Sequence, residues 1–177
     1  RVFPELDSAI EWVEDRLLGT VEHTVVEAET PMQLQEMELF HNRKDETLTD
    51  LESRMSKRVF AAGEPIYARG EPGDALYLIR RGTVRIFAPL GAGRSRHIAS
   101  FGRGDFFGGL AFLDGRPRGN DAIAFSETEV YVLSQEQFSK LSDEHKKLAF
   151  TLITAIARTL AIRLRHADTE LTMLQEY

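Results

Sequence analysis

The 177-residue sequence contains no cysteine, and this absence excludes several chemistries at once. A disulfide scaffold, a thiolate zinc site, an iron–sulfur cluster and a cysteine nucleophile all need the missing side chain. Long apolar runs are missing too, because none approaches the ~18 residues that a membrane-spanning helix requires. What remains is an ordinary composition for a soluble globular protein, with 42% hydrophobic and 28% charged residues.

Catalytic motifs are equally scarce. The five histidines are dispersed along the chain, and only His97 falls in the glycine-rich part, so no histidine cluster can hold a metal there. The patterns GxxxxGK[ST], GxSxG and HExxH are all missing. We therefore predict a protein that is not an enzyme and has no metal and no resident cofactor.

Charge is unevenly distributed. Residues 1–56 carry a net charge of −9 and residues 57–177 a net charge of +3, which gives −6 for the whole chain. The acidic first part argues against general nucleic-acid binding, so no nucleic-acid partner is expected. The mildly basic remainder favours a small anion as a ligand.

Glycine is concentrated in the middle of the chain. Twelve of the 13 glycines lie between Gly63 and Gly119, and seven of the 11 phenylalanines lie in or beside the same stretch. Over residues 57–133, short apolar runs alternate with glycine-containing turns about every ten residues, a pattern that predicts an all-β sandwich or small barrel.

The end of the chain has a different pattern. Residues 135–177 contain neither glycine nor proline, and leucine and isoleucine recur at helical spacing from Leu148 to Leu174. At ~1.5 Å per residue, a helix over 143–177 would be ~50 Å long, which exceeds the core that a small domain can offer. We expect its end to pack on a second copy of the chain, giving a homodimer, with a helix that folds back or frays as the alternative.

One segment, FGGLAFLDGRPRGNDA over residues 107–122, combines features of a phosphate-binding site. Two consecutive glycines let the backbone approach a ligand, and the apolar stretch after them can form one helical turn with free N–H groups. Arg118 follows a stiffening proline and can bind two phosphate oxygens through its planar guanidinium. A glycine-rich turn with a solvated arginine is the alternative. The predicted ligand contacts are Gly108, Gly109, Leu110, Ala111, Arg118, Gly119 and Asn120.

The span from Leu39 to about Leu174 resembles the cyclic-nucleotide-binding domain found in the catabolite activator protein, in kinase regulatory subunits and in gated channels. The matching pieces occur in the family's order: Leu39-Phe40, Gly63-Glu64-Pro65-Ile66, Gly70-Glu71-Pro72-Gly73-Asp74, Leu76-Tyr77-Leu78-Ile79, Gly82-Thr83-Val84, Gly104-Asp105-Phe106-Phe107-Gly108 and Pro117-Arg118. The resemblance implies an eight-stranded jelly-roll (a double-stranded β-helix) with flanking helices and a long C-terminal helix. It also implies a cyclic nucleotide such as cyclic AMP as a ligand, bound by a short cassette helix and Arg118.

Two departures from the family pattern affect the expected ligand. The family usually has a glutamate for the ribose 2′-hydroxyl where this chain has Gly109, and Ala or Thr where it has Gly119 and Asn120. A lost charge-assisted hydrogen bond costs roughly 1.5–3 kcal/mol. Asp121 is a candidate replacement for the carboxylate. Weakened cyclic-nucleotide binding, a different small phosphate ligand and a ligand-free scaffold all remain open.

Two substitutions follow from this interpretation. Arg118→Ala is expected to abolish cyclic-nucleotide binding and leave the fold intact. Gly109→Glu is expected to tighten cyclic AMP binding by about tenfold or more.

Residues 3–18 resemble the last helix of a STAS domain in sulfate-permease-family anion transporters. On this basis residues 1–20 are predicted to be a helix remnant of a preceding domain, 21–38 an acidic linker, 39–142 the cyclic-nucleotide-binding-like domain and 143–177 the long helix. The expected function is a regulatory module on the cytoplasmic side of a bacterial transporter, with that transporter's membrane domain as a partner. The alternatives are a structural dimerisation scaffold and the sensor of a transcription regulator without its DNA-binding part.

Overall fold

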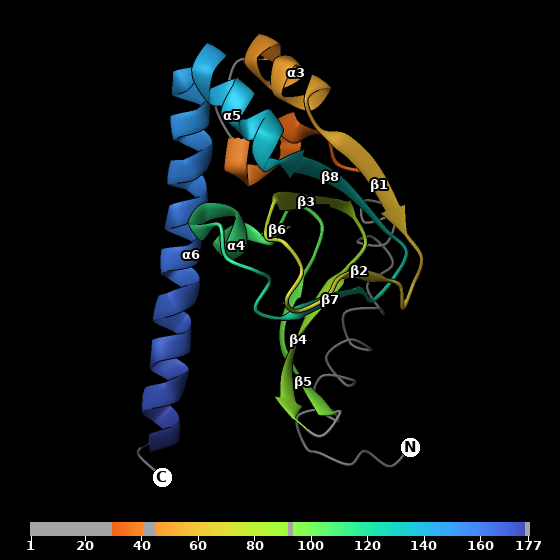
Figure 1. Ribbon diagram of the computed structural model, residues 1–177, viewed down its shortest axis with the longest axis vertical. Coiled ribbons are helices and arrows are strands. Elements are labelled where there is room, and N and C mark those ends of the chain that lie inside the picture. The colour runs from red at the N-terminus through yellow and green to blue at the C-terminus, as the bar shows by residue number, and fades with distance from the viewer. Residues whose placement is uncertain (1–29, 41–44, 92–93, 176–177) are drawn as a thin grey trace. The chain divides into compact units, whose positions relative to one another are not determined.

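A computed structural model describes residues 30–40, 45–91 and 94–175 of the chain (Figure 1). The predicted helix remnant over 1–20 lies outside these residues, as does the first part of the predicted linker over 21–38. The residues from Met32 to Tyr177 form one compact unit.

Eight strands form two antiparallel four-stranded sheets, which confirms the predicted jelly-roll followed by a long C-terminal helix. The first sheet has the order β1 (Ser56–Phe60), β8 (Thr128–Ser134), β3 (Ala75–Arg81) and β6 (Phe106–Phe107). The second sheet has the order β2 (Pro65–Tyr67), β7 (Asp121–Ala124), β4 (Val84–Gly91) and β5 (Arg94–Phe101).

Strand β3 is buried on both faces, and this explains the unbroken apolar run Ala75–Ile79 with which it begins. Successive side chains of a strand point to opposite faces. Leu76 and Leu78 accordingly join a cluster with the helices, whereas Tyr77 and Ile79 join the cluster between the two sheets. The strand thus separates two layers of core.

The helical elements pack against one side of the first sheet, where their apolar side chains share a core cluster with Leu76, Leu78 and Leu133. They are η1 (Leu34–Glu36), η2 (Glu38–Phe40), α3 (Asp45–Ser53), α4 (Gly109–Asp114), α5 (Gln135–Glu144) and α6 (Lys146–Gln175). The single helix predicted over 143–177 is divided, because His145 leaves the helical conformation with φ −130° and ψ 63°. Figure 1 shows α4 lying between the strands and α6. In the described residues, no helix has the length and apolar character needed to cross a bilayer.

The segment just before α3 belongs to the core, which moves the start of the compact unit from the predicted 39 to Met32. Leu34 and Met37 have no exposed surface, although 21–38 was predicted to be a linker. The buried guanidinium of Arg80 holds the segment to β3: its Nε donates to the Met32 carbonyl at 3.1 Å, and it forms an ion pair with Glu129. Leu34 and Met37 were not predicted as core residues because most of the residues around them in 21–38 are polar or acidic.

Leu34→Ala is expected to lower the free energy of unfolding by about 2–5 kcal/mol, because it leaves a cavity in a closed core. Gln35→Ala, at the exposed neighbouring position, is the matched control and is expected to change it by less than about 0.5 kcal/mol. Urea denaturation of both variants measures the difference. Equal stabilities would show that the segment is a linker after all.

Candidate functional site

The predicted cassette forms the expected short helix between β6 and β7. Gly108 precedes α4 in the left-handed conformation with φ +79°, and Gly115 ends the helix in the same conformation. The chain then returns through Arg118, whose backbone N–H donates to the Glu71 carbonyl at 2.8 Å. The Arg118 carbonyl accepts from the Gly70 N–H, also at 2.8 Å. These two hydrogen bonds attach the segment between α4 and β7 to the turn between β2 and β3.

The Arg118 side chain is turned inward and is only 3% exposed. Its Nη1 donates to the Gly108 carbonyl at 3.0 Å and its Nη2 to the Ala75 carbonyl at 2.7 Å. The alternative of a solvated arginine is thus excluded by the structure. The guanidinium donates to two backbone carbonyls in the interior, and in Arg118→Ala both carbonyls would lose their donor. The structure therefore argues against the expectation that Arg118→Ala leaves the fold intact.

Aromatic rings enclose the guanidinium. Its central carbon lies 4.4 Å from the ring centre of Tyr67 and 5.5 Å from that of Tyr77, and Tyr77 stacks on Phe107 at 4.9 Å. Burial raises the pKa of Tyr67 to about 12, although the nearby Arg118 charge acts in the opposite direction. The ring faces offset part of the desolvation of the cation.

The charge of Arg118 has no counter-ion among the described residues. The Nε atom is buried and makes no hydrogen bond. A buried charge is normally paired, since the unpaired form is costly in free energy. The site therefore holds a positive charge and a free N–H donor in an apolar surrounding, which together favour an anion.

Gly108 is required by Arg118 itself. A Cβ atom at this position would lie 2.7 Å from the Arg118 Nη1, and the positive φ would be strained in any other residue. The sequence analysis assigned this glycine to ligand approach. The structure gives it a second reason, which is the close approach of the guanidinium to the backbone.

Gly109 is covered by α6 and β6. A Cβ atom here would lie 3.1 Å from Cε2 of Phe106 and 3.3 Å from Cγ2 of Ile156. A glutamate at this position would have to displace Phe106 or α6. The expected gain in affinity from Gly109→Glu consequently depends on a shift of that helix.

The other predicted contacts lie around this centre with different exposure. Ala111 is buried, whereas the Leu110 side chain is 69% exposed and directed away from the core. Gly119 is exposed and Asn120 is half-buried in the bend that leads into β7. Asp121, the candidate replacement carboxylate, accepts from the Arg69 N–H at 2.7 Å. That carboxylate therefore already has a backbone donor.

Arg163 on α6 also lies close to the cassette, although it was not predicted from the sequence. Its guanidinium lies 4.2 Å from the ring centre of Phe101 and donates to the Phe106 carbonyl at 3.2 and 3.3 Å. Burial lowers the pKa of Arg163, against the attraction of Asp105. The sequence could have indicated Arg163, because it lies seven residues after Ile156 and residues seven apart share a helix face.

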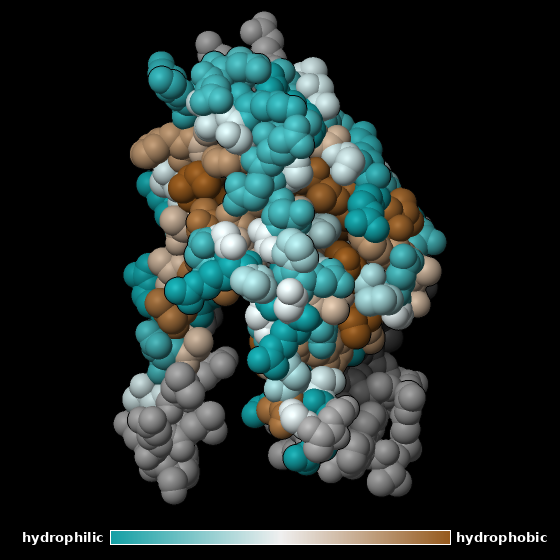
Figure 2. All heavy atoms as spheres, in the orientation of Figure 1, coloured by the Kyte–Doolittle hydropathy of each residue, from teal (hydrophilic) through white to brown (hydrophobic). Residues whose placement is uncertain are grey.

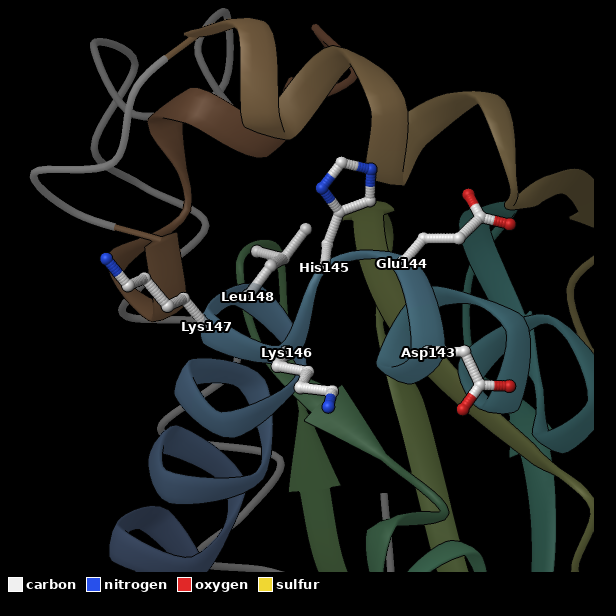
Figure 3. Close-up of a pocket in the computed structure, with 6 residues that line it drawn as sticks. All are labelled: Asp143, Glu144, His145, Lys146, Lys147 and Leu148. Atoms are coloured by element: carbon white, nitrogen blue, oxygen red, sulfur yellow. The ribbon is translucent and has the colours of Figure 1, made fainter.

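Two hollows on the surface are lined by residues outside 108–120. One, of about 480 Å³, is at the junction of α5 and α6, where His145 extends toward α3 and its Nε2 lies 3.2 Å from an Asp50 oxygen (Figure 3). The other, of about 620 Å³, is a groove beside α6, which we call the α6 groove. It is lined by Glu38, Leu39, Gly104, Asp105, Phe106, Phe150, Thr151, Thr154, Ala155, Arg158, Thr159 and Ile162. Neither hollow opens onto Arg118.

Comparisons with known proteins agree with this geometry. The model of the family described as "Cyclic nucleotide-binding domain" matches residues 57–145. The "Cyclic AMP receptor protein" of Thermus thermophilus is 35% identical over 136 residues, which are 77% of this chain and 61% of that protein. The crystal structure of the Thermus thermophilus catabolite activator protein gives a TM-score of 0.67 at 34% identity, covering 77% of this chain and 62% of that one.

A further relative matches nearly the whole chain. "Glutaminase 1" of Bradyrhizobium diazoefficiens is 28% identical over 174 residues, which are 98% of this chain and 27% of the glutaminase. The chain thus spans about three fifths of the receptor protein and about a quarter of the glutaminase.

Gly109→Ala is expected to destabilise the protein by about 1–3 kcal/mol, because the added methyl group meets Phe106 and Ile156. The same substitution in an Ile156→Ala background is expected to cost at least about 0.5 kcal/mol less, since the opposing methyl group is gone. Urea unfolding of the four proteins of this cycle gives the interaction energy. Strict additivity would contradict direct packing of α6 on α4.

Proposed function

The chain belongs to the cyclic nucleotide-binding domain family, and we propose that it is a regulatory, non-catalytic module that senses a cyclic nucleotide such as cyclic AMP. The observation that carries the proposal is the Arg118 guanidinium, which is buried without a counter-ion among the described residues and keeps a free Nε donor. A phosphate diester supplies the missing negative charge and two acceptor oxygens.

The similarity to a cyclic AMP receptor protein supports this ligand class. A cyclic AMP receptor protein shares 35% of the aligned residues. Gly109 nevertheless leaves the site without a carboxylate on α4, so we expect a weaker contact with the sugar. A different small phosphate ligand is therefore the second candidate, and the enclosed guanidinium favours a ligand-free scaffold as the third.

The contacts of α4 suggest how a bound ligand would act. The Gln135 side chain of α5 donates to the Phe112 carbonyl, and Phe112 packs edge-on against Phe138 at 5.4 Å. Ile156 of α6 covers Gly109. A ligand at Arg118 shifts α5 and α6 only if it binds one arrangement of α4 better than the other.

We also propose that α6 forms a homodimer with a second copy of the chain. The helix has 30 residues, or about 45 Å at ~1.5 Å per residue, and Ile156 is the last buried residue among those of its side chains that the structure describes. Phe150 and Ile162, which both line the α6 groove, are 74% and 52% exposed. Figure 2 shows hydrophobic surface along the side formed by α6. Exposed apolar side chains beside a groove favour a partner, and the same surface of a second copy supplies one.

The larger protein to which this module is attached has three candidates. The resemblance of residues 3–18 to a STAS helix favours a sulfate-permease-type anion transporter, with the module on its cytoplasmic side. The match to Glutaminase 1 over 98% of the chain favours a glutaminase instead. A transcription regulator is a third possibility, because the receptor protein shares the fold. The full-length reading frame distinguishes them: membrane spans, a glutaminase domain or a helix-turn-helix.

Arg118→Gln is expected to weaken cyclic AMP binding at least about 100-fold, because the bound phosphate loses its charged partner. Arg116→Gln is the matched control: this neighbouring arginine side chain is 82% exposed and is expected to leave affinity within about twofold. Isothermal titration measures both, and thermal unfolding records the stability that Arg118→Gln also loses. Unchanged affinity in Arg118→Gln would remove Arg118 from the site.

Ile162→Lys and Phe150→Lys are expected to convert a dimer into a monomer, since each places a charge in the apolar face of α6. Val59→Lys, at a residue on β1 that is 59% exposed, is expected to remain dimeric. Sedimentation velocity over a range of protein concentrations tests all three. A monomeric wild type, or a dimer indifferent to the α6 substitutions, would refute the α6 interface.

A further inference from the structure

Tyr67 forms one wall of the Arg118 site and comes from β2, outside the cassette. Its side chain is 9% exposed, and its ring centre lies 4.4 Å from the guanidinium carbon. The ring is also 5.7 Å from Tyr77 and 5.9 Å from Phe107. The ring is thus held by packing on two sides, and the guanidinium lies over its face.

The phenol of Tyr67 makes no hydrogen bond with any residue that the structure describes. Its oxygen keeps some exposed surface although the side chain as a whole is buried, so the hydroxyl is accessible to a ligand. Tyr131 differs, because its hydroxyl donates to the Glu52 carboxylate at 2.9 Å and lies 3.1 Å from the Gln33 amide oxygen. The guanidinium that carries the unpaired Nε of Arg118 therefore lies over the ring of Tyr67, whose hydroxyl also has no partner among the described residues.

We propose that Tyr67 is a ligand-binding residue whose hydroxyl donates a hydrogen bond to the same phosphate group that pairs with Arg118. The inference rests on the proposed function and adds a second, neutral donor to it. The phenol is protonated at neutral pH, as any tyrosine is, and burial raises its pKa further, to about 12. A protonated phenol donates to an anion, whereas a phenolate would repel it.

Tyr77 is less suited to the same role, although it is equally buried. Burial raises its pKa, and the charges around its phenol include the carboxylates of Asp74 and Glu71 as well as Arg118 and Arg58. The two carboxylates disfavour an anion beside Tyr77. Among the charged groups, only Arg118 acts on Tyr67.

Isothermal titration with cyclic AMP on wild type, Tyr67→Phe and Tyr131→Phe tests the proposal. Tyr67→Phe keeps the ring and its stacking on Arg118 but removes the donor, and a roughly tenfold loss of affinity is expected. Tyr131→Phe, which loses a phenol in the other core cluster, is expected to keep its affinity within about twofold. Thermal unfolding establishes that each variant is folded at the titration temperature.

A second measurement separates a direct hydrogen bond from a loss of packing. The two phosphorothioate diastereomers of cyclic AMP each replace one exocyclic oxygen by sulfur, a weaker acceptor. One diastereomer is expected to bind wild type more weakly than cyclic AMP does, and Tyr67→Phe is expected to reduce that difference to less than about twofold. The effects of Tyr67→Phe and of the oxygen-to-sulfur replacement on binding free energy are then not additive, which shows that the hydroxyl and that ligand oxygen interact.

The outcomes are distinguishable. Tyr67→Phe with wild-type affinity, or without coupling to either sulfur, overturns the role of Tyr67 while the proposed function stands. A wild type that binds neither cyclic AMP nor its analogues overturns the proposed function and the Tyr67 inference with it.

Discussion

The enclosed guanidinium of Arg118 is the constraint on which the rest of the site depends. It joins three segments that are distant in sequence: the carbonyl of Ala75 on β3, the carbonyl of Gly108 before α4, and the ring of Tyr67 on β2. The backbone of Arg118 is bonded to the turn at Gly70 and Glu71. A cation so placed is stabilised by carbonyl dipoles and ring faces but not by a carboxylate, so its interaction free energy with an entering anion is large. The same contacts that stabilise the fold therefore also prepare the site.

On its other side, the cassette is in contact with α6. Ile156 packs at Gly109, and Arg163 donates to the carbonyl of Phe106, the residue two positions before Gly108. The rings of Phe101 and Phe107, 6.5 Å apart, connect the surroundings of Arg163 with those of Arg118. This continuous packing brings the helix and the charged site within one core. Movement at either end must change contacts at the other, because packed interiors have few alternative arrangements.

Most of the fold could be predicted from the sequence because its signals are local. Glycine turns between apolar runs gave the strands of the jelly-roll, and the absence of glycine and proline after residue 134 gave the terminal helices. The pattern around Gly108 and Arg118 gave the cassette helix. Leu34 and Met37 were missed as core residues because two apolar side chains in an acidic stretch make a weak pattern. The inward orientation of Arg118 and the proximity of Tyr67 depend on pairing between strands, and a single sequence does not specify which side chains meet across sheets.

Gly109 lies in the cassette and packs against Ile156 of α6, so a change at this position affects both the site and the helix. A side chain at this position would need Phe106 and Ile156 to shift by a few tenths of an ångström, so a carboxylate on α4 competes with the close packing of α6. This chain has the packed helix. The consequence under the proposed function is a site that binds through phosphate alone and whose affinity includes the cost of any change in α6. A ligand that must first free an enclosed guanidinium binds more weakly, in proportion to the fraction of molecules in the competent state. If dimerisation through α6 changes the packing of this helix on α4, it also changes the affinity for the ligand. By linkage, the ligand then changes the dimerisation constant by the same factor.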